Sequence, residues 1–196
     1  CSAYKFFGPH VGILWGRREL LESIRPYKLR PSPETLPGRW MTGTQNHEGI
    51  AGAAAAVRYL ASLRTEDQPA SGDNTANLSA QLDQTFARIV GYERTLSEQL
   101  LSGLQQISSV RILGLQDLSR LADRVPTVSF LIKDRTPRDC AEALAQRGLY
   151  VWCGNHYALP FTEAAGLEPQ GTIRVGALHY TTAAEIQRLL DAVAKL

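Results

Sequence analysis

The sequence opens with CSAYKFFGPHVG (residues 1–12), and this stretch decides how the rest of the chain is interpreted. It places Lys5 beside Phe6 and Phe7, between the hydroxyl residue Ser2 and a Gly-Pro turn. Burial beside aromatic rings lowers the pKa of a lysine ammonium, which suits an amine that forms a Schiff base. The alternative is a structural lysine at the edge of an apolar strand, with its ammonium extending into solvent. Both interpretations place Lys5 on an apolar segment.

The composition is that of a globular protein of one large or two small domains, since the chain has 196 residues. Its 21 basic and 19 acidic residues give a net charge of +2 and are spread along the chain, which argues against nucleic-acid and membrane partners. The longest apolar stretch, residues 50–57, is too short to cross a bilayer. The three cysteines have no metal-ligand spacing and indicate reduced thiols of an intracellular protein without a metal site: Cys1, Cys140 and Cys153.

The first half of the chain predicts helices separated by irregular segments. Residues 11–16 form an apolar run between glycines, which predicts a strand covered on both faces. A short helix over 17–24 precedes a proline-rich loop at 25–39. Asn46 is expected to cap a helix over 47–63, whose alanines allow close packing against a neighbour. The polar stretch 65–77 marks a boundary or surface loop. Apolar residues at helical spacing from Leu78 to Ile107 then predict a long amphipathic helix.

The second half alternates short strands and helices. Strands are expected at 110–113, 128–132, 149–153 and 172–175, with a helix over 137–147 between the second and third. Thr136, before Pro137 and with Asp139 three residues later, is the expected cap of the helix over 137–147. Thr182 and Glu185 form a capping box at the start of a final helix. This order predicts a small α+β unit with helices on one face of a mainly antiparallel sheet.

Three further places carry residues suited to a site. The turn at 42–46 precedes a helix, and a helix N-terminus favours an anion such as a phosphate, although a plain N-cap with a turn glycine has the same pattern. The polar loop 154–160 is either a cleft loop or a simple connection. Arg174 lies in an apolar strand and is expected to be buried, so its guanidinium needs a carboxylate partner from the protein or from a substrate.

Taken together, the runs at 2–9, 43–46 and 174–186 resemble the class V aminotransferase family, and within it the cysteine desulfurase-like enzymes that use pyridoxal phosphate (PLP). The resemblance is collinear and spans nearly the whole chain. It implies an α/β fold that is the C-terminal part of a fold-type-I PLP-dependent transferase. Residues 1–64 would be the tail of the large PLP-binding domain, 65–107 a polar loop and long inter-domain helix, and 108–196 the small α+β C-terminal domain.

The resemblance also assigns roles to individual residues. Lys5 matches the lysine that forms the Schiff base with PLP and shuttles the proton at the substrate α-carbon. Ser2 matches a hydroxyl that holds the cofactor phosphate, and Thr44 matches a threonine that reaches that phosphate from the partner subunit of a homodimer. Arg174 matches the arginine that grips the α-carboxylate of an amino-acid substrate. The residues that bind the pyridine ring belong to a part of the family's large domain that precedes the lysine, so the isolated chain is expected to bind PLP poorly.

Two positions depart from the family. Tyr4 stands where many members have His before the Schiff-base lysine, and Tyr157 stands where desulfurases of this branch have a nucleophilic Cys. Cys153 lies four residues earlier, either as a buried inert thiol or as one that still reaches the substrate.

The expected function is therefore a cytoplasmic, PLP-dependent, cysteine desulfurase-like enzyme acting on an amino acid, with an unidentified sulfur acceptor protein. An epimerase, a lyase or an aminotransferase on the same scaffold is the alternative reaction. An inactive domain or binding module, in which Lys5 is only structural, is the alternative outside enzymes.

Overall fold

The computed structural model describes residues 1–63 and 77–196, which form two compact units, Cys1–Phe86 and Ala87–Leu196. The polar boundary expected at 65–77 lies almost wholly outside the described residues. The long amphipathic helix is confirmed as α3 (Leu78–Gln105), which begins in the first unit and ends in the second. The chain is therefore mixed α/β, as expected, while the domain limits inferred from the sequence stay a prediction.

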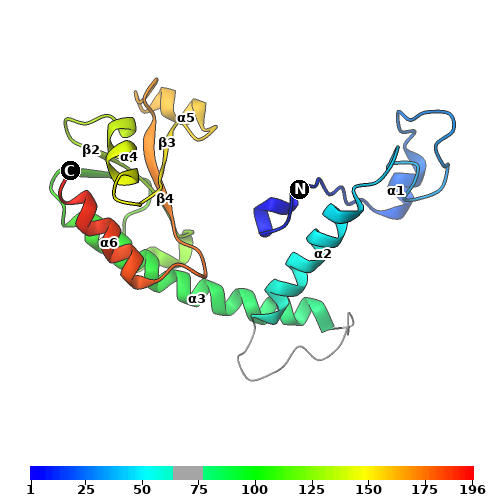
Figure 1. Cartoon of the computed structure of the whole chain (residues 1–196), viewed down its shortest axis with the longest axis horizontal. Helices are drawn as coiled ribbons and strands as arrows, with labels where there is room; N and C mark the ends of the chain where they lie inside the picture. Colours follow the sequence, from blue (N-terminus) through cyan, green and yellow to red (C-terminus); the bar gives the residue numbers. More distant parts are fainter. Residues whose placement is uncertain (64–76) are drawn as a thin grey trace. The chain divides into compact units, whose positions relative to one another are not determined.

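The first unit contains the 3-10 helix η1 (Ala3–Phe6), α1 (Arg18–Ser23) and α2 (His47–Ser62) (Figure 1). These bounds confirm the helices predicted at 17–24 and 47–63. Asn46 caps α2 as expected, because its Oδ1 accepts a hydrogen bond of 2.9 Å from the amide of Gly49. Residues 25–39 form neither helix nor strand, as their prolines predict.

The strand predicted at residues 11–16 is wrong. The only pairing there is an isolated antiparallel bridge between Ser2 and Gly12, and the exposed fractions of Leu14 and Trp15 are 72% and 80%. A strand covered on both faces needs neighbours at both edges, and among the described residues only the first three residues of the chain pair with this run.

Helix α2 packs against the segment that carries Lys5. A Cβ at Gly52 would lie 3.0 Å from Cγ of Pro9, so the helix and the end of the Lys5 turn approach closely at this glycine. Ala53 and Ala56 are buried, which confirms at these two positions the close packing predicted for the alanines of the helix. The start of α3 joins the same unit through Thr85, whose hydroxyl donates a 2.8 Å hydrogen bond to the carbonyl of Leu60 in α2.

The second unit is built on a four-stranded sheet of β1 (Val110–Leu113), β2 (Thr127–Ile132), β3 (Trp152–Gly154) and β4 (Thr172–Gly176). The strand order is β1-β2-β4-β3 and every neighbouring pair is antiparallel. This confirms the predicted antiparallel sheet, although the third strand begins at Trp152 rather than at Leu149.

The helices of this unit cover one face of the sheet. Side chains of α3, α4 (Pro137–Ala145) and α6 (Ala183–Val193) form one buried cluster with the strands, which includes Leu104, Phe130 and Ile173. Figure 1 shows α6 running alongside α3, and Leu190 of α6 lies so close to Gly103 that a Cβ there would come within 2.3 Å of it. The short helices α5 (Leu159–Ala164) and η3 (Leu118–Asp123) were not predicted.

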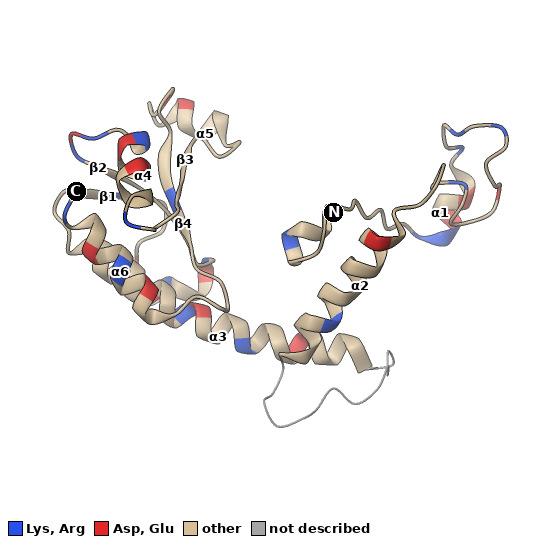
Figure 2. Cartoon of the chain, viewed as in Figure 1, with Lys and Arg blue, Asp and Glu red and all other residues tan. Residues whose placement is uncertain are grey.

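The caps predicted for α4 and α6 are confirmed. Thr136 accepts the amide of Asp139, and the hydroxyl of Thr182 accepts the amide of Glu185, whose carboxylate accepts the amide of Thr182 in return. Basic and acidic residues both occur along α3 and α6 (Figure 2), in keeping with a chain whose charges are interspersed. Within residues 1–63 and 77–196, none of the helices combines the length and the apolar character that a bilayer span requires.

Candidate functional site

Lys5 lies on a tight turn that two short backbone contacts define. The amide of Ala3 donates to the carbonyl of Val11 (2.9 Å), and the amide of Gly8 donates to the carbonyl of Ala3 (2.8 Å). Phe7 ends η1 in the left-handed conformation, with φ of 68°, and a Cβ at Gly8 would come within 2.9 Å of Ala3. The turn predicted after Lys5 is therefore present, and it closes on the buried Ala3.

The surroundings of Lys5 differ from the apolar setting expected from the sequence. The lysine is exposed, because η1 turns its side chain away from Ala3, the only buried residue of that helix. Ser2 is the N-cap residue of η1, yet its side chain makes no capping hydrogen bond. An accessible primary amine and an uncommitted hydroxyl, three residues apart, are a donor set that fits an aldehyde and a phosphate on one ligand.

Thr44 belongs to the same unit and lies on the turn that leads into α2. Gly43 has a φ of 75° and open space around its Cα, and Thr44 is exposed. The Asn46 side chain caps α2 and the Gln45 amide donates to the carbonyl of Gly43, so the hydroxyls of Thr42 and Thr44 are the side-chain groups that this turn offers to an anion. An apolar hollow of about 590 Å³ lies beside the turn, between residues 36–41, the Lys5 segment and α2.

Arg174 lies in the second unit, at the middle of β4. It is exposed, whereas Ile173 and Val175 on either side are buried, so the strand alternates and turns Arg174 to the face that the helices leave open. The buried arginine inferred from the apolar strand is therefore wrong. Among the described residues no carboxylate forms an ion pair with Arg174.

The register of the sheet shows what surrounds Arg174. Ser129 of β2 and Trp152 of β3 are its direct cross-strand partners, so their side chains lie on the same open face. Ser129 also lines a surface hollow of about 590 Å³ together with Phe161 of α5. Cys153 pairs instead with the fully buried Ile173 and therefore lies on the opposite, core-facing side. Arg174 and the Cys153 thiol are on different faces of the sheet.

The loop after β3 is fastened to the strand that carries Arg174. Nε2 of His156 lies 3.2 Å from the carbonyl oxygen and 3.1 Å from the hydroxyl of Thr172. A Cβ at Gly171 would come within 2.0 Å of the backbone of Gly154, so the loop passes directly over this glycine. Tyr157 of this loop is fully exposed.

This loop is strained and holds a perturbed histidine. His156 and Tyr157 have φ values of 56° and 60°, a left-handed conformation that is uncommon for such side chains. Burial, followed by the positive charge of Arg174, lowers the pKa of His156, while the hydrogen bond with the backbone of Thr172 opposes that shift. The Nδ1 atom of His156 is buried and has no partner among the described residues. The polar loop singled out in the sequence is thus anchored to β4 through His156.

The structure brings Ser2 and Lys5 together on one turn and places Thr44 in the same unit, whereas Arg174 belongs to the other unit. His156 lies in the loop that sequence reasoning had marked. The sequence did not predict a role for Arg39, which joins the loop before Thr44 to α1. The only feature that marks this position in the sequence is the Arg-Trp pair at the end of the proline-rich segment.

Comparison with known proteins shows which family and which solved structures this chain is similar to. The sequence profile of the class-V aminotransferases matches residues 75–189. A probable cysteine desulfurase of Pseudomonas putida is 29% identical over 98% of this chain, and the alignment covers 43% of that protein. The structure of a cysteine desulfurase from Thermococcus onnurineus aligns with a TM-score of 0.63 at 25% identity, over 81% of this chain and 33% of that one. The Escherichia coli cysteine desulfurase CsdA aligns with a TM-score of 0.72 at 24% identity, over 99% and 44% of the two chains. The chain thus spans less than half the length of these relatives.

Proposed function

The chain belongs to the class V aminotransferase family, and we propose that it is the part of a PLP-dependent, cysteine desulfurase-like enzyme that carries the cofactor lysine and the substrate arginine. The observation that carries the proposal is Arg174, which lies exposed on the open face of the sheet with no protein carboxylate paired to it in the described part of the chain. A planar guanidinium in that position suits a bidentate contact with the α-carboxylate of an amino acid.

The residues of the first unit are assigned to the cofactor. Lys5 Nζ would hold PLP covalently and afterwards move the proton at the substrate α-carbon. The hydroxyl of Ser2 would donate to the phosphate, and that of Thr44 would donate to the phosphate bound by the partner subunit of a homodimer. PLP, when bound, supplies an electron sink for the substrate. The exposure of Lys5 and the uncommitted Ser2 hydroxyl support these roles.

A second reaction on the same scaffold has its own supporting observation. Sulfur transfer to a protein thiol needs a cysteine that reaches the substrate, yet Tyr157 stands at the loop position and Cys153 lies on the core face, opposite Arg174. This arrangement favours an epimerase, a lyase or an aminotransferase over a persulfide-forming desulfurase. A desulfurase reaction would have to pass sulfur to the exposed Cys1 or to an acceptor outside this chain.

The alternative of a structural Lys5, as in a binding module, also fits an exposed lysine, because its ammonium would extend into solvent. The two roles differ in the covalent bond to PLP, which only the cofactor lysine forms. We also propose a cytoplasmic location, because Cys1, Cys140 and Cys153 are all unpaired.

The test is a substrate assay on the full-length protein loaded with PLP. L-Cysteine is supplied with a thiol reductant and with 2-oxoglutarate as amino acceptor, and the products are measured. Alanine with sulfide indicates a desulfurase, pyruvate with sulfide a lyase, D-cysteine an epimerase, and 3-mercaptopyruvate an aminotransferase. Arg174→Lys should raise the KM for the amino acid about tenfold or more, since one guanidinium-carboxylate fork is lost. Arg111→Lys is the matched control, because Arg111 is an exposed arginine on the same open face. An unchanged KM in Arg174→Lys contradicts the assignment.

A further inference from the structure

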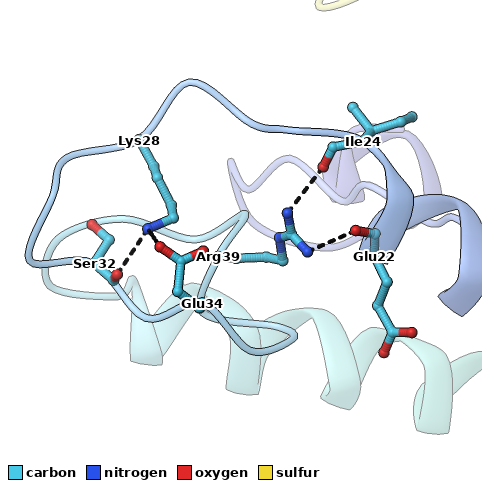
Figure 3. A network of polar contacts seen from close by, with 6 residues as sticks. All are labelled: Glu22, Ile24, Lys28, Ser32, Glu34 and Arg39. Atoms are coloured by element: carbon cyan, nitrogen blue, oxygen red, sulfur yellow. Dashed lines mark hydrogen bonds and ion pairs between the residues drawn. The ribbon is translucent and has the colours of Figure 1, made fainter.

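The loop between α1 and Thr44 is closed at its neck by hydrogen bonds from two consecutive residues. Arg39 donates from Nη1 to the carbonyl of Glu22 (2.9 Å) and from Nη2 to the carbonyl of Ile24 (3.1 Å) (Figure 3). Trp40 donates from Nε1 to the carbonyl of Leu21 (3.0 Å). These three bonds, which we call the neck clamp, join residues 39–40 to the end of α1 across a separation of 15 to 19 residues.

The neck clamp uses a property specific to arginine. The carbonyls at the C-terminal end of a helix have no partner within the helix, and the two arms of one guanidinium bind two of them at once. Nε of Arg39 is buried and has no partner among the described residues, so the group is held by its two outer nitrogens alone. A lysine ammonium has no fork with which to reproduce this contact.

A second contact stiffens the loop without touching its neck. Lys28 donates to the carboxylate of Glu34 (2.7 Å) and to the carbonyl of Ser32 (3.0 Å), and both acceptors lie within the loop itself (Figure 3). This pair does not reach α1. It therefore provides an internal comparison for the clamp.

The position of the clamp in the chain determines what it controls. Three residues separate Trp40 from Thr44, and this short connection contains neither helix nor strand. Beside it lies the apolar hollow of about 590 Å³, lined by Trp40 and Met41 on one side and by α2 on the other. Packing across a hollow supplies few contacts. The path of residues 41–45 therefore depends on the clamp before it, on the Asn46 cap after it, and on one local bond from Gln45 Nε2 to the carbonyl of Gly43 (3.0 Å).

We propose that Arg39, together with Trp40, is a positioning residue that fixes Thr44 for its contact with the cofactor phosphate. This inference rests on the phosphate role proposed for Thr44. Arg39 acts through the backbone and touches neither cofactor nor substrate. Its loss should weaken only the part of cofactor binding that depends on the phosphate.

The test compares PLP with pyridoxal, which lacks the phosphate, in the full-length protein. The ratio of the two dissociation constants, measured from the absorbance of the lysine-bound chromophore, gives the phosphate preference. Arg39→Lys and Thr44→Val should each lower this preference about tenfold or more, since a hydrogen bond to a charged group is weakened or lost. Glu34→Gln, which alters the loop's internal pair, should leave it unchanged. In the cofactor-free protein, Arg39→Lys should also speed hydrogen exchange at the Met41 amide, which donates to the carbonyl of Gly38 (3.3 Å) directly beside the clamp.

The double variant separates the positioning role of Arg39 from the phosphate role of Thr44. If Arg39 acts through Thr44, adding Arg39→Lys to Thr44→Val lowers the preference no further. A preference that Thr44→Val leaves intact overturns the phosphate role of Thr44. A preference that falls in Thr44→Val but not in Arg39→Lys, or falls additively in the double variant, overturns the role of Arg39. If Arg39→Lys does not fold, Trp40→Phe decides, because it removes one clamp bond and keeps an aromatic ring; an unchanged preference then refutes the proposal.

Discussion

Replacing Gly171 with alanine should displace the loop that carries His156 and Tyr157. Gly171 has a φ of 67°, and the added Cβ would lie 2.0 Å from the carbonyl carbon of Gly154, well inside the 3.4 Å at which ordinary contact begins. The obstructing atoms belong to the backbone, so no side-chain rotation relieves the contact. The left-handed conformation costs an alanine about 1 kcal/mol, and the overlap adds about 1–3 kcal/mol, as in overpacked cores.

Gly166→Ala is the matched control for this substitution. Gly166 has nearly the same φ, 66°, but a Cβ there meets no atom within 4 Å. In urea denaturation, the control should lose about 1 kcal/mol of unfolding free energy and Gly171→Ala about 2–4 kcal/mol. Hydrogen exchange at the Ala158 amide, which donates to Asn155 (2.8 Å), should accelerate only in Gly171→Ala. Equal losses in the two variants would refute the close passage of the loop over β4.

Three further predictions concern titration and buried polar groups. Hydrogen bonds from the backbone and hydroxyl of Thr182 lower the pKa of Glu185 in the folded protein. These bonds stabilise the fold fully above pH 4.5, and their contribution is lost as the pH falls through the lowered pKa. In Glu185→Gln, the free energy of unfolding should therefore depend less steeply on pH in this range. Burial, followed by the charge of Arg174, lowers the pKa of His156 in the folded protein. The unfolded chain therefore binds a proton at a higher pH than the folded chain does, and the free energy of unfolding decreases as the pH drops below 6.5. In an NMR titration, the His156 midpoint should lie below 6.5 and should rise in Arg174→Gln but not in Arg174→Lys. Thr85→Val removes the hydroxyl that donates to the carbonyl of Leu60 in α2, and should lower the free energy of unfolding by about 1 kcal/mol. Thr85→Ser keeps the hydroxyl and should lose less. An unchanged free energy of unfolding in Thr85→Val would show that this bond contributes little.

The sequence predicted the elements whose signals are local. Asn46, Thr136 and Thr182 are capping residues, and each begins the expected helix because the capping bonds are made within three residues. The sheet of the second unit followed from alternating apolar residues and from the turns between them. Such patterns depend only on residues close in sequence and on which side chains face the core or the solvent, so they can be seen in the sequence.

The errors concern positions whose environment depends on distant segments. The run at 11–16 has the composition of a covered strand, but it finds only one pairing segment among the described residues. Arg174 was expected to be buried because its neighbours are apolar, yet a sheet with one open face turns alternate residues outward. The neck clamp joins residues up to 19 positions apart, so the local sequence did not predict the hydrogen bonds of Arg39. The register that separates Cys153 from Arg174 likewise became visible only with the sheet assembled.

The central claim is that Lys5 holds the cofactor, and chemical trapping tests it most directly. The full-length protein is incubated with PLP, reduced with borohydride and digested, and the modified lysine is located by mass spectrometry. The account predicts the reduced phosphopyridoxyl group on Lys5, and loss of the visible absorbance band in Lys5→Ala. Modification of another lysine, such as Lys28, or an unchanged band in Lys5→Ala, would contradict it.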